Sequence, residues 1–421
     1  MAGIGSTGKP QDTIVSVTPL RVDRDTRTFK EAASFSRLGY RSVVVEGHAS
    51  DLEPSDVPFE LMSAEGPGAT TVGPHVHASQ QRSLLRRGAS RPLRVPAEVA
   101  VYYARSRAMA ARIPPADLYW LHSYDQAAAV LLAARRNGTP IVYDAHDFYP
   151  EIIEGGEGTR PEKAALRAFL RRMERRAAHR AAATVTVSDG VAELFVQDGR
   201  SRPLVIRNCA ELRIAPRGVT SVRDVVGVGP EDFLVVMPGN HKPGTRAVDE
   251  AIAALRQLPP STHLAFVGQG YDSFDRQAGS SSARVHFLPA VPALEVPSFI
   301  ASADAAIVLY VPTLDDIEHA LPNGLFSAIA AGLPLLYPRL AEIRRIAAEY
   351  DLGLVIDPRD PASIAAGVRA LAESPEAIAR YRANAERART VLNWEREEET
   401  LAEIVRSVLA RRPRQTVEAA T

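Results

Sequence analysis

A histidine between two aspartates is the part of this sequence best suited to chemistry. His146 follows Asp144 by two positions and precedes Asp147, and all three come directly after an apolar stretch at residues 140–143. Side chains that follow a buried strand emerge at the carboxyl edge of the sheet, where open α/β sheets bind ligands. There His146 can bond a substrate hydroxyl or polarise a reacting group, with an aspartate to orient it; the alternative is a structural histidine. His122, which ends another apolar run, is a weaker candidate for the same edge.

Cations near the start of the chain form a second candidate group. Arg27 and Lys30 stand at the opening of a helix that we expect to begin at Thr28. A helix N-terminus attracts anions, so these side chains can contact a phosphate or a polar acceptor. The alternative is that Asp25 and Thr26 cap the helix while the arginines are solvated. The absence of a G-x-G-x-x-G pattern argues against a standard dinucleotide site in this half of the chain.

A glycine-rich turn with cations marks the second half. Gly239, Lys242 and Arg246 follow an apolar run at residues 233–237. Glycines let a ligand approach the backbone, and cations beside a helix N-terminus suit a diphosphate. The same residues also fit an ordinary turn between a strand and a helix. Gly268, after a later apolar run, is a similar but weaker signal.

The segment 319–334 contains a helix start that can hold a phosphate without side-chain charge. Asn323, preceded by Pro322, has the residue type of an N-cap, and the amides of residues 324–326 would then lack partners within the helix. A plain capped helix explains the segment equally well. Gly332 suits the C-terminal end of that helix.

Short apolar runs that alternate with helix-period segments are the elements that position these residues. Continuous apolar strands between helices indicate a parallel sheet covered on both faces, hence a doubly wound α/β domain. The pattern restarts near residue 215 and predicts a second Rossmann-like set, so that two sheets would face each other across a cleft. The predicted strands are residues 13–17, 42–46, 117–121, 140–143 and 184–187, then 233–237, 263–267, 285–288, 304–310, 334–337 and 352–356.

Composition bounds the class of protein. The 421 residues suggest two or three domains, and 50 basic against 50 acidic residues argue against a dedicated nucleic-acid binder. The single cysteine, Cys209, excludes a disulfide framework within the chain and is expected to be structural. No apolar stretch is long enough to span a bilayer and no signal peptide is visible, so we expect a cytoplasmic protein. The arginine-rich helix at residues 166–180 is better explained by a solvated face than by a membrane or polyanion site. Residues 63–96 are predicted to form a long loop with some helix, and the tail after Arg412 to be frayed.

Taken in order, several segments resemble the glycosyltransferase family 4 group of GT-B enzymes along nearly the whole chain. The resemblance rests on the order and spacing of segments and not on one decisive motif. Those segments are D-x-R-x-x-K-E-A at residues 25–32, Y-D-A-H-D-F-Y-P-E at 143–151, and the stretches 187–190, 206–211, 266–270, 285–289, 322–326 and 393–398. The last resembles the start of the family's C-terminal helix, which crosses back to the first domain.

This resemblance implies retaining transfer of a sugar from a nucleotide-diphosphate sugar. It implies an acceptor domain at residues 1–214 with the helix at about 393–412, a donor domain at 215–392 and a disordered tail at 413–421. Metal is not expected, because cations and helix amides would neutralise the leaving diphosphate. The implied catalytic residues are His146, Lys242 and Arg246; the donor-binding residues are Gly239, Asn240, Gly268, Leu288, Val291, Glu318, His319, Asn323, Gly324, Leu325 and Ser327; and the acceptor-binding residues are Arg27, His122, Asp144 and Asp147.

The sequence departs from the family's pattern at several donor positions. Where the family commonly has P-N-K-L-F-E, this chain has Gly324 for the lysine and Ser327 for the glutamate that binds the donor ribose. The acid expected eight residues before that glutamate is His319, next to Glu318, and the arginine expected after Gly239 is Asn240. Loss of a carboxylate that bonds a ribose typically costs ~1.5–3 kcal/mol. Donor handling is therefore altered, or activity is lost.

These observations lead to one leading hypothesis and two rivals. The leading one is a glycosyltransferase that takes a GDP- or UDP-linked sugar, as a monomer or a homodimer, and transfers it to a small soluble acceptor in specialised metabolism. A family precedent, the S-glycosyltransferase of lincosamide biosynthesis, suggests a GDP-sugar and a small thiol as one option. The first rival is a degenerate GT-B protein that binds nucleotide or supports a partner transferase. The second is a GT-B nucleotide-sugar epimerase, which would need acidic catalytic residues in the cleft.

Overall fold

The chain divides into two compact units. The computed structural model describes residues 11–63, 94–149, 161–213, 220–274, 283–313 and 315–411. Unit 1 comprises Met1–Thr186, Asp198–Val205 and Glu398–Thr421, and unit 2 comprises Val187–Gln197 and Ile206–Glu397. The domain limits expected from the sequence, 1–214 and 215–392, stay predictions, because the units are defined by contacts and not by independent folding. The predicted tail lies outside the described residues.

Unit 1 is built on a parallel sheet of seven strands in the order β3-β2-β1-β4-β5-β6-β7. Its central strands are almost fully buried because they carry continuous apolar runs, as parallel strands covered on both faces require. The edge strands β3 and β7 are short and escape sequence-based prediction. The strands are β1 (Thr13–Thr18), β2 (Arg41–Glu46), β3 (Glu60–Ser63), β4 (Leu118–His122), β5 (Ile141–Ala145), β6 (Ala183–Thr186) and β7 (Leu204–Val205).

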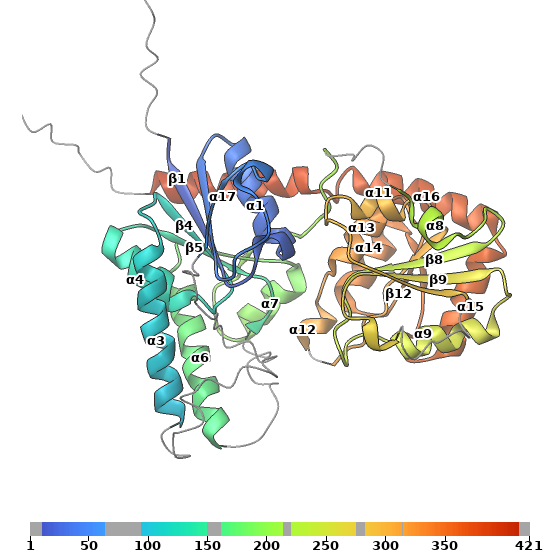
Figure 1. The fold of residues 1–421 in the computed structure, drawn as a ribbon, viewed down its shortest axis with the longest axis horizontal. Coiled ribbons are helices and arrows are strands. Elements are labelled where there is room, and N and C mark those ends of the chain that lie inside the picture. Colours follow the sequence, from blue (N-terminus) through green and yellow to red (C-terminus); the bar gives the residue numbers. More distant parts are fainter. Residues whose placement is uncertain are drawn as a thin grey trace, which may run out of the picture. The chain divides into compact units, whose positions relative to one another are not determined.

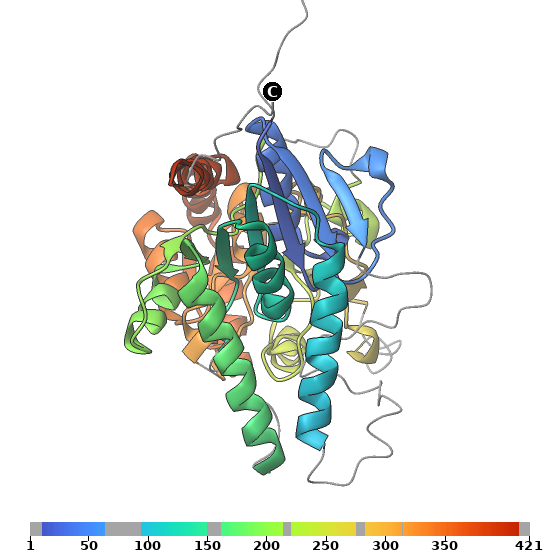
Figure 2. The same cartoon turned by 90° about the vertical axis from the view of Figure 1, so that its left-hand side faces the viewer.

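Helices cover both faces of this sheet (Figures 1 and 2). Helix α1 (Thr26–Arg37) packs on β1 and β2, while α3 (Arg94–Arg112), α4 (Ala127–Asn137) and α6 (Pro161–Arg180) pack on one another and α4 and α6 contact the sheet. The helix α3 begins within the segment predicted to be a long loop; residues 64–93 of that segment lie outside the described part. Helix α6 follows the predicted amphipathic pattern, with Leu170 and Met173 buried and Arg172 exposed.

Unit 2 repeats the strand order of a Rossmann-like sheet, β10-β9-β8-β11-β12-β13, with every pair parallel. Its core lies on both faces, with α9 and α15 on one side and α11, α13, α14 and α16 on the other (Figure 1). Cys209 is buried in the second of these layers, as expected for a structural cysteine. The strands are β8 (Phe233–Pro238), β9 (Thr262–Val267), β10 (Val285–Leu288), β11 (Ala305–Ile307), β12 (Leu335–Tyr337) and β13 (Gly353–Val355). The helices are α7 (Asp189–Gln197), α8 (Val222–Val226), α9 (Val248–Ala254), α11 (Val296–Ile300), α12 (Asp315–Glu318), α13 (Asn323–Ala330), α14 (Ala341–Tyr350), α15 (Pro361–Ala372) and α16 (Pro375–Arg389).

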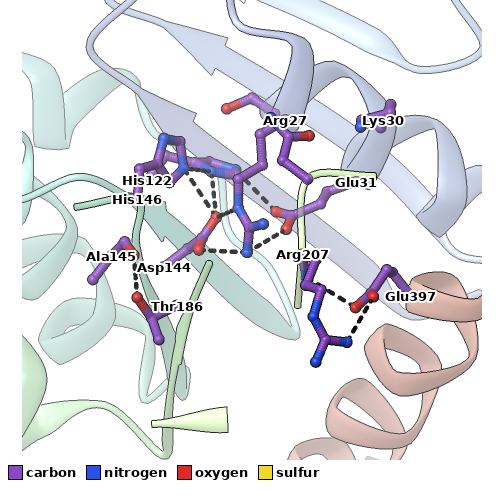
Figure 3. A network of polar contacts seen from close by, with 12 residues as sticks. Arg27, Lys30, Glu31, His122, Asp144, Ala145, His146, Thr186, Arg207 and Glu397 are labelled. Atoms are coloured by element: carbon purple, nitrogen blue, oxygen red, sulfur yellow. Dashed lines mark hydrogen bonds and ion pairs between the residues drawn. The ribbon is translucent and has the colours of Figure 1, made fainter. Parts of the chain in front are cut away.

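The last helix, α17 (Trp394–Ala410), is shared by the two units, which confirms the expected return to the first. Its first residues bind the chain segment that enters unit 2. Glu397 accepts a hydrogen bond from the amide of Arg207 at 2.9 Å (Figure 3), and Glu395 accepts one from the amide of Leu212 at 3.0 Å. Glu398 forms an ion pair with Arg37 of α1 at 2.9 Å within unit 1. Among the described residues, no helix is both long and apolar enough to cross a membrane.

Candidate functional site

Parallel register brings the polar residues of unit 1 together. His122 ends β4 and pairs directly with Asp144 of β5, so their side chains emerge side by side at the carboxyl edge of the sheet. His146 follows one residue after β5 ends and its side chain turns back toward both. Its Nε2 lies 3.0 Å from Asp144 Oδ2 and 3.2 Å from His122 Nδ1, and that Nδ1 lies 3.1 Å from the same carboxylate oxygen (Figure 3).

Helix α1 adds a buried cation and a buried acid to this group. Arg27 donates two hydrogen bonds of 2.8 Å to Asp144, one to each oxygen, in the fork geometry that suits a guanidinium and a carboxylate. The carboxylate of Glu31, one turn further along α1, lies 3.2 Å from Arg27 Nη2 and 3.8 Å from His122 Nε2. The side chains of Arg27, Asp144 and Glu31 are at most 3% exposed, whereas that of His146 is 20% exposed.

The start of α1 differs from the sequence prediction. The helix begins at Thr26, and Asp25 is the N-cap, its side chain accepting a hydrogen bond from the amide of Thr28 at 3.2 Å. The expected alternative, a capped helix with solvated arginines, is thus half right. Asp25 caps the helix, but Arg27 and Lys30 are each only 2% exposed. Binding of an acceptor by Arg27 stays a prediction, and its guanidinium is already bonded to Asp144.

Burial and mutual charge set the protonation of this group. Burial disfavours a charged His146, but the adjacent Asp144 carboxylate outweighs it and raises the pKa of His146 to about 9. Burial opposes ionisation of Asp144 as well, yet Arg27 and His146 hold its pKa well below the usual range. Burial together with the charge of Asp144 raises the pKa of Glu31 to about 8, and burial lowers the pKa of His122. At neutral pH, His146 is therefore a cation, Asp144 an anion, and Glu31 and His122 are neutral.

The same atoms have the spacing of metal ligands. Among the described residues, one group of His, Cys, Asp or Glu side chains meets that criterion, namely His122, Asp144 and His146, whose ligand atoms lie within 4.8 Å of one another. Arg27 already donates to both oxygens of Asp144, and a divalent cation on Oδ2 would lie next to this guanidinium. We therefore identify the group as a hydrogen-bonded ion network. The expectation that no metal is needed stays a prediction.

The surroundings of this network include one residue with a strained backbone. Ser123, directly after His122, has a φ of 65°, which is rare for a residue other than glycine. Its amide donates to the carbonyl of Asp144 at 3.1 Å, and its hydroxyl donates to Asp125 at 2.9 Å. Asp147, the fourth predicted acceptor residue, is half-buried beside the network and its side chain is not a member of it.

In unit 2, the predicted donor residues lie where three loops meet at the carboxyl edge of the sheet. The amide of Gly239, after β8, donates to the carbonyl of Val267, and that of Gly268, after β9, donates to the carbonyl of Leu288 at 3.1 Å. A Cβ on Gly268 would come within 2.5 Å of the Gly239 carbonyl oxygen, and a Cβ on Gly324 would overlap the carbonyl of Pro238. These glycines are thus required by close backbone packing.

The two predicted cations of this edge differ in their surroundings. Lys242 is exposed. Arg246 is half-buried, and its guanidinium carbon lies 3.3 Å from the centre of the Tyr310 ring, a cation–π contact that the sequence does not reveal because 64 positions separate the two residues. Burial lowers the pKa of Arg246, which remains charged at neutral pH.

Several predicted donor-binding side chains have structural partners. Asn240 accepts a hydrogen bond from the amide of Gln269 at 2.9 Å and so joins two loops. Glu318 accepts one from the amide of Ala341 at 3.0 Å, at the start of α14. Both side chains therefore hold loops of unit 2 in place.

The start of α13 corrects another expectation. Asn323 is the first residue of the helix and not its N-cap; Pro322 holds the N-cap position, and its carbonyl accepts a hydrogen bond from the amide of Leu325 at 3.0 Å. The Asn323 side chain accepts a hydrogen bond of 2.7 Å from that of Asn208. Gly332, with a φ of 70°, follows the helix as expected.

The remaining donor candidates line the same part of unit 2. Leu288 and Val291 are partly buried against the core, and Ser327 is half-buried on α13. His319 lies against Gly190 at the start of α7, where a Cβ would overlap its ring, and its carbonyl accepts a hydrogen bond from Ser188 at 2.8 Å. Glu31 and Tyr310 are the residues that sequence reasoning missed. The D-x-R-x-x-K-E-A segment contained Glu31, and its position one turn after Arg27 was the available signal.

Comparison with known proteins adds a family assignment to this geometry. Residues 26–209 match the family model described as a glycosyl transferase 4-like domain, and residues 232–374 match the model described as glycosyl transferases group 1. Together the two models cover more than three quarters of the chain. Among curated proteins, the glycogen synthase of Mycobacterium tuberculosis is 27% identical over 218 residues, 50% of this chain and 49% of that protein. The chain therefore spans about half the length of the curated relatives it matches.

Solved structures of several proteins share the fold. HepE of Anabaena in complex with UDP and glucose superposes with a TM-score of 0.65 at 17% identity, over 94% of this chain and 100% of that one. WaaG, a glycosyltransferase involved in lipopolysaccharide biosynthesis, gives 0.64 at 19% identity, over 93% of this chain and 99% of that one. Sucrose-phosphate synthase from Thermosynechococcus elongatus gives 0.64 at 13% identity, over 94% of this chain and 99% of that one.

Proposed function

Because this chain belongs to the family 4-like group of GT-B glycosyltransferases, we propose that it transfers a sugar, with retention of configuration, from a nucleotide-diphosphate sugar to a small acceptor. Unit 2 binds the donor and unit 1 binds the acceptor. The donor is a UDP- or GDP-linked sugar; HepE, which shares the fold, has been solved with UDP-glucose.

One observation carries the donor site: three loops meet at the carboxyl edge of the unit 2 sheet with glycines at their contacts. Gly268 and Gly324 let these loops pack more closely than a Cβ would allow, and the first amides of α13 lie at the same edge. The exposed Lys242 supplies a mobile cation beside them. A diphosphate needs this combination of backbone donors and positive charge, and the same groups stabilise the charge that develops on the leaving diphosphate.

Arg246 plays a different part from Lys242. Its guanidinium carbon lies 3.3 Å from the centre of the Tyr310 ring, so the side chain is preorganised and loses little entropy when it contacts a phosphate. In this proposal Arg246 is the cation that packing holds in place, and Lys242 is the exposed cation whose side chain moves to contact the bound diphosphate. His146, at the edge of unit 1, contacts a hydroxyl of the transferred sugar.

The acceptor is a small molecule with a hydroxyl or thiol nucleophile. A thiol is one option, since a thiolate attacks with little help from a general base. This suits a site in which His146 is held as a cation by Asp144 and is no base at neutral pH.

The experiment is a panel of UDP-, GDP- and TDP-sugars, each incubated with hydroxyl and thiol acceptors and assayed by release of nucleoside diphosphate. Turnover of one donor with at least one acceptor supports the proposal, and the anomeric configuration of the product, determined by NMR, tests retention. Failure of every donor and acceptor would overturn it.

A matched pair of substitutions tests the donor site. Lys242→Met is expected to raise the KM for the donor about tenfold or more, because a charge-assisted bond to phosphate contributes roughly 1.5–3 kcal/mol. Arg256→Met is the control. Arg256 is an exposed cation of the same unit that precedes β9, hence at the amino edge of the sheet, and its loss should leave the KM unchanged.

Two observations favour the degenerate alternative. Asn240 and Glu318 are engaged in structural hydrogen bonds, and Ser327 stands where the family has a carboxylate. Thermal shift with UDP, GDP and TDP separates the two possibilities, because stabilisation by a nucleotide without turnover of any sugar donor would support a binding protein.

A further inference from the structure

One ring nitrogen of His146, Nε2, contacts the buried polar side chains of the network. Nε2 faces Asp144 Oδ2 at 3.0 Å and His122 Nδ1 at 3.2 Å, so this nitrogen is turned into unit 1. The side chain is nevertheless 20% exposed, whereas its partner Asp144 is fully buried. Nδ1 is therefore the ring nitrogen left to meet a ligand.

The Asp144 carboxylate, which contacts His146 Nε2, is itself held in place. Asp144 lies in β5, opposite His122 in the register, and Arg27 donates one hydrogen bond to each of its oxygens. Such a carboxylate neither rotates nor takes up a proton easily, because its two lone-pair regions are already engaged by cationic donors. It holds the Nε2 proton of His146 in place.

We propose that Asp144, with Arg27 and Glu31 behind it, is a positioning residue that keeps His146 doubly protonated and directs its Nδ1–H outward, so that His146 acts in sugar transfer as a hydrogen-bond donor and not as a general base. This inference rests on the proposed glycosyl transfer. The charged and titratable groups around the ring are Asp25 and Arg27 from the start of α1, Glu31 from the same helix, His122 from β4 and Asp144 from β5.

Glu31 has a distinct role in this arrangement. A second buried anion beside Asp144 would repel it, and burial raises the pKa of Glu31 to about 8. Arg27 Nη2 lies 2.8 Å from Asp144 Oδ1 and 3.2 Å from Glu31 Oε1, and a neutral Glu31 competes less strongly than an ionised one for this nitrogen. Ionisation of Glu31 above pH 8 would divide the guanidinium between two carboxylates and loosen the hold on His146.

The first experiment follows the His146 ring by NMR during a pH titration of the full chain, with the signal assigned by its absence in His146→Gln. The expected midpoint is about 9 in the native protein and 6.5 or lower in Asp144→Asn. This measurement needs no substrate, so it tests the positioning even if no sugar donor is turned over. A native midpoint below 7 would overturn the proposal.

The second experiment is the pH profile of kcat/KM with whichever donor the panel identifies. A hydrogen-bond donor requires the protonated ring, so the native profile should fall as pH rises through about 9, whereas a general base with the same pKa would give a profile that rises over that range. At pH 8.5 about three quarters of His146 is protonated with a pKa of about 9, and about 1% with a pKa of 6.5. Asp144→Asn should therefore lose activity several tens of fold at pH 8.5 and come within a few fold of the native protein at pH 6. An equal loss at both pH values would indicate a merely structural role and refute the positioning.

Glu31→Gln supplies the variant that preserves the fold. An amide resembles the neutral acid in size and charge but cannot ionise, so the ratio of this variant's activity at pH 9 to its activity at pH 7 should exceed the native ratio. A tenfold loss at pH 7 would show that Glu31 must be ionised and would contradict its assigned role.

Titration of the chelator-treated protein with Zn²⁺ tests the alternative that His122, Asp144 and His146 bind a metal ion. Stoichiometric shifts of the His122 and His146 signals that Asp144→Asn abolishes would identify a metal site and overturn the proposal.

Discussion

Removal of the Arg27 guanidinium is expected to destabilise unit 1 far more than removal of an equivalent surface arginine. In Arg27→Met the Asp144 carboxylate, whose side chain is 0% exposed, loses two hydrogen bonds of 2.8 Å and its permanent cation. Breaking one partner of a buried pair costs about 3–5 kcal/mol, and His146 still faces Asp144, so we expect a loss of about 3 kcal/mol in the free energy of unfolding. The control is Arg41→Met. Arg41 makes the same bidentate contact with Glu60, but both side chains are about half exposed, and such pairs contribute about 0–1 kcal/mol.

The assay can report on unit 1 alone because the two tryptophans divide between the units. Trp120 lies in β4 of unit 1 and Trp394 lies in the part of α17 that belongs to unit 2. In a Trp394→Phe background, urea unfolding followed by tryptophan fluorescence monitors the surroundings of Trp120, with the same background for each variant. The double variant Arg27→Met/Asp144→Asn should recover at least about 1 kcal/mol of the loss, since the buried anion is gone as well. A cost for Arg27→Met no larger than that of Arg41→Met, or simple additivity in the double variant, would refute the reasoning.

Three further outcomes follow from the same geometry. Gly324→Ala should destabilise unit 2 by about 1–3 kcal/mol because its Cβ overlaps the carbonyl of Pro238, while Gly229→Ala, where the nearest atom is 3.4 Å away, should stay within about 0.5 kcal/mol in thermal or urea unfolding. Ser327→Glu, which restores the family's ribose carboxylate, should lower the donor KM by about tenfold or more, and an unchanged KM would show that the ribose is bound elsewhere. His146 has a folded pKa raised from 6.5 to about 9, so its contribution to stability is present below pH 6.5 and is lost as pH rises through about 9; urea unfolding of the native protein should weaken by about 3 kcal/mol over that range, and His146→Gln should flatten the dependence.

The sequence was sufficient for the architecture and for the placement of Asp144 and His146 at the carboxyl edge of the unit 1 sheet. Apolar runs at β1, β4 and β5 are long and buried, so their positions and the residues that follow them, including Asp144 and His146, could be predicted. The edge strands β3 and β7 could not, because they are short and gain their structure from pairing with a neighbour and not from an apolar pattern of their own.

The partners within the site were beyond the reach of local pattern. Arg27 and Asp144 are 117 positions apart, and only the packing of α1 against the sheet decides that Arg27 bonds this carboxylate instead of a ligand. Glu31 was overlooked because a charged residue is seldom fully buried unless it is paired. At Asn323 the preference of asparagine for the N-cap was misleading, because Pro322, with its fixed backbone angle and extended conformation, already ends the preceding loop there.

The shared helix α17 determines the order in which the two units are completed during translation. Residues that complete unit 1, including the buried Leu401, Ile404 and Val405, are synthesised after the whole of unit 2. Unit 1 cannot bury its last helix during translation of its own strands, and unit 2 is able to finish first, against the usual order in which the N-terminal domain folds before the rest. Synthesis therefore completes every residue of unit 2 before it reaches Glu398, where the part of α17 that belongs to unit 1 begins.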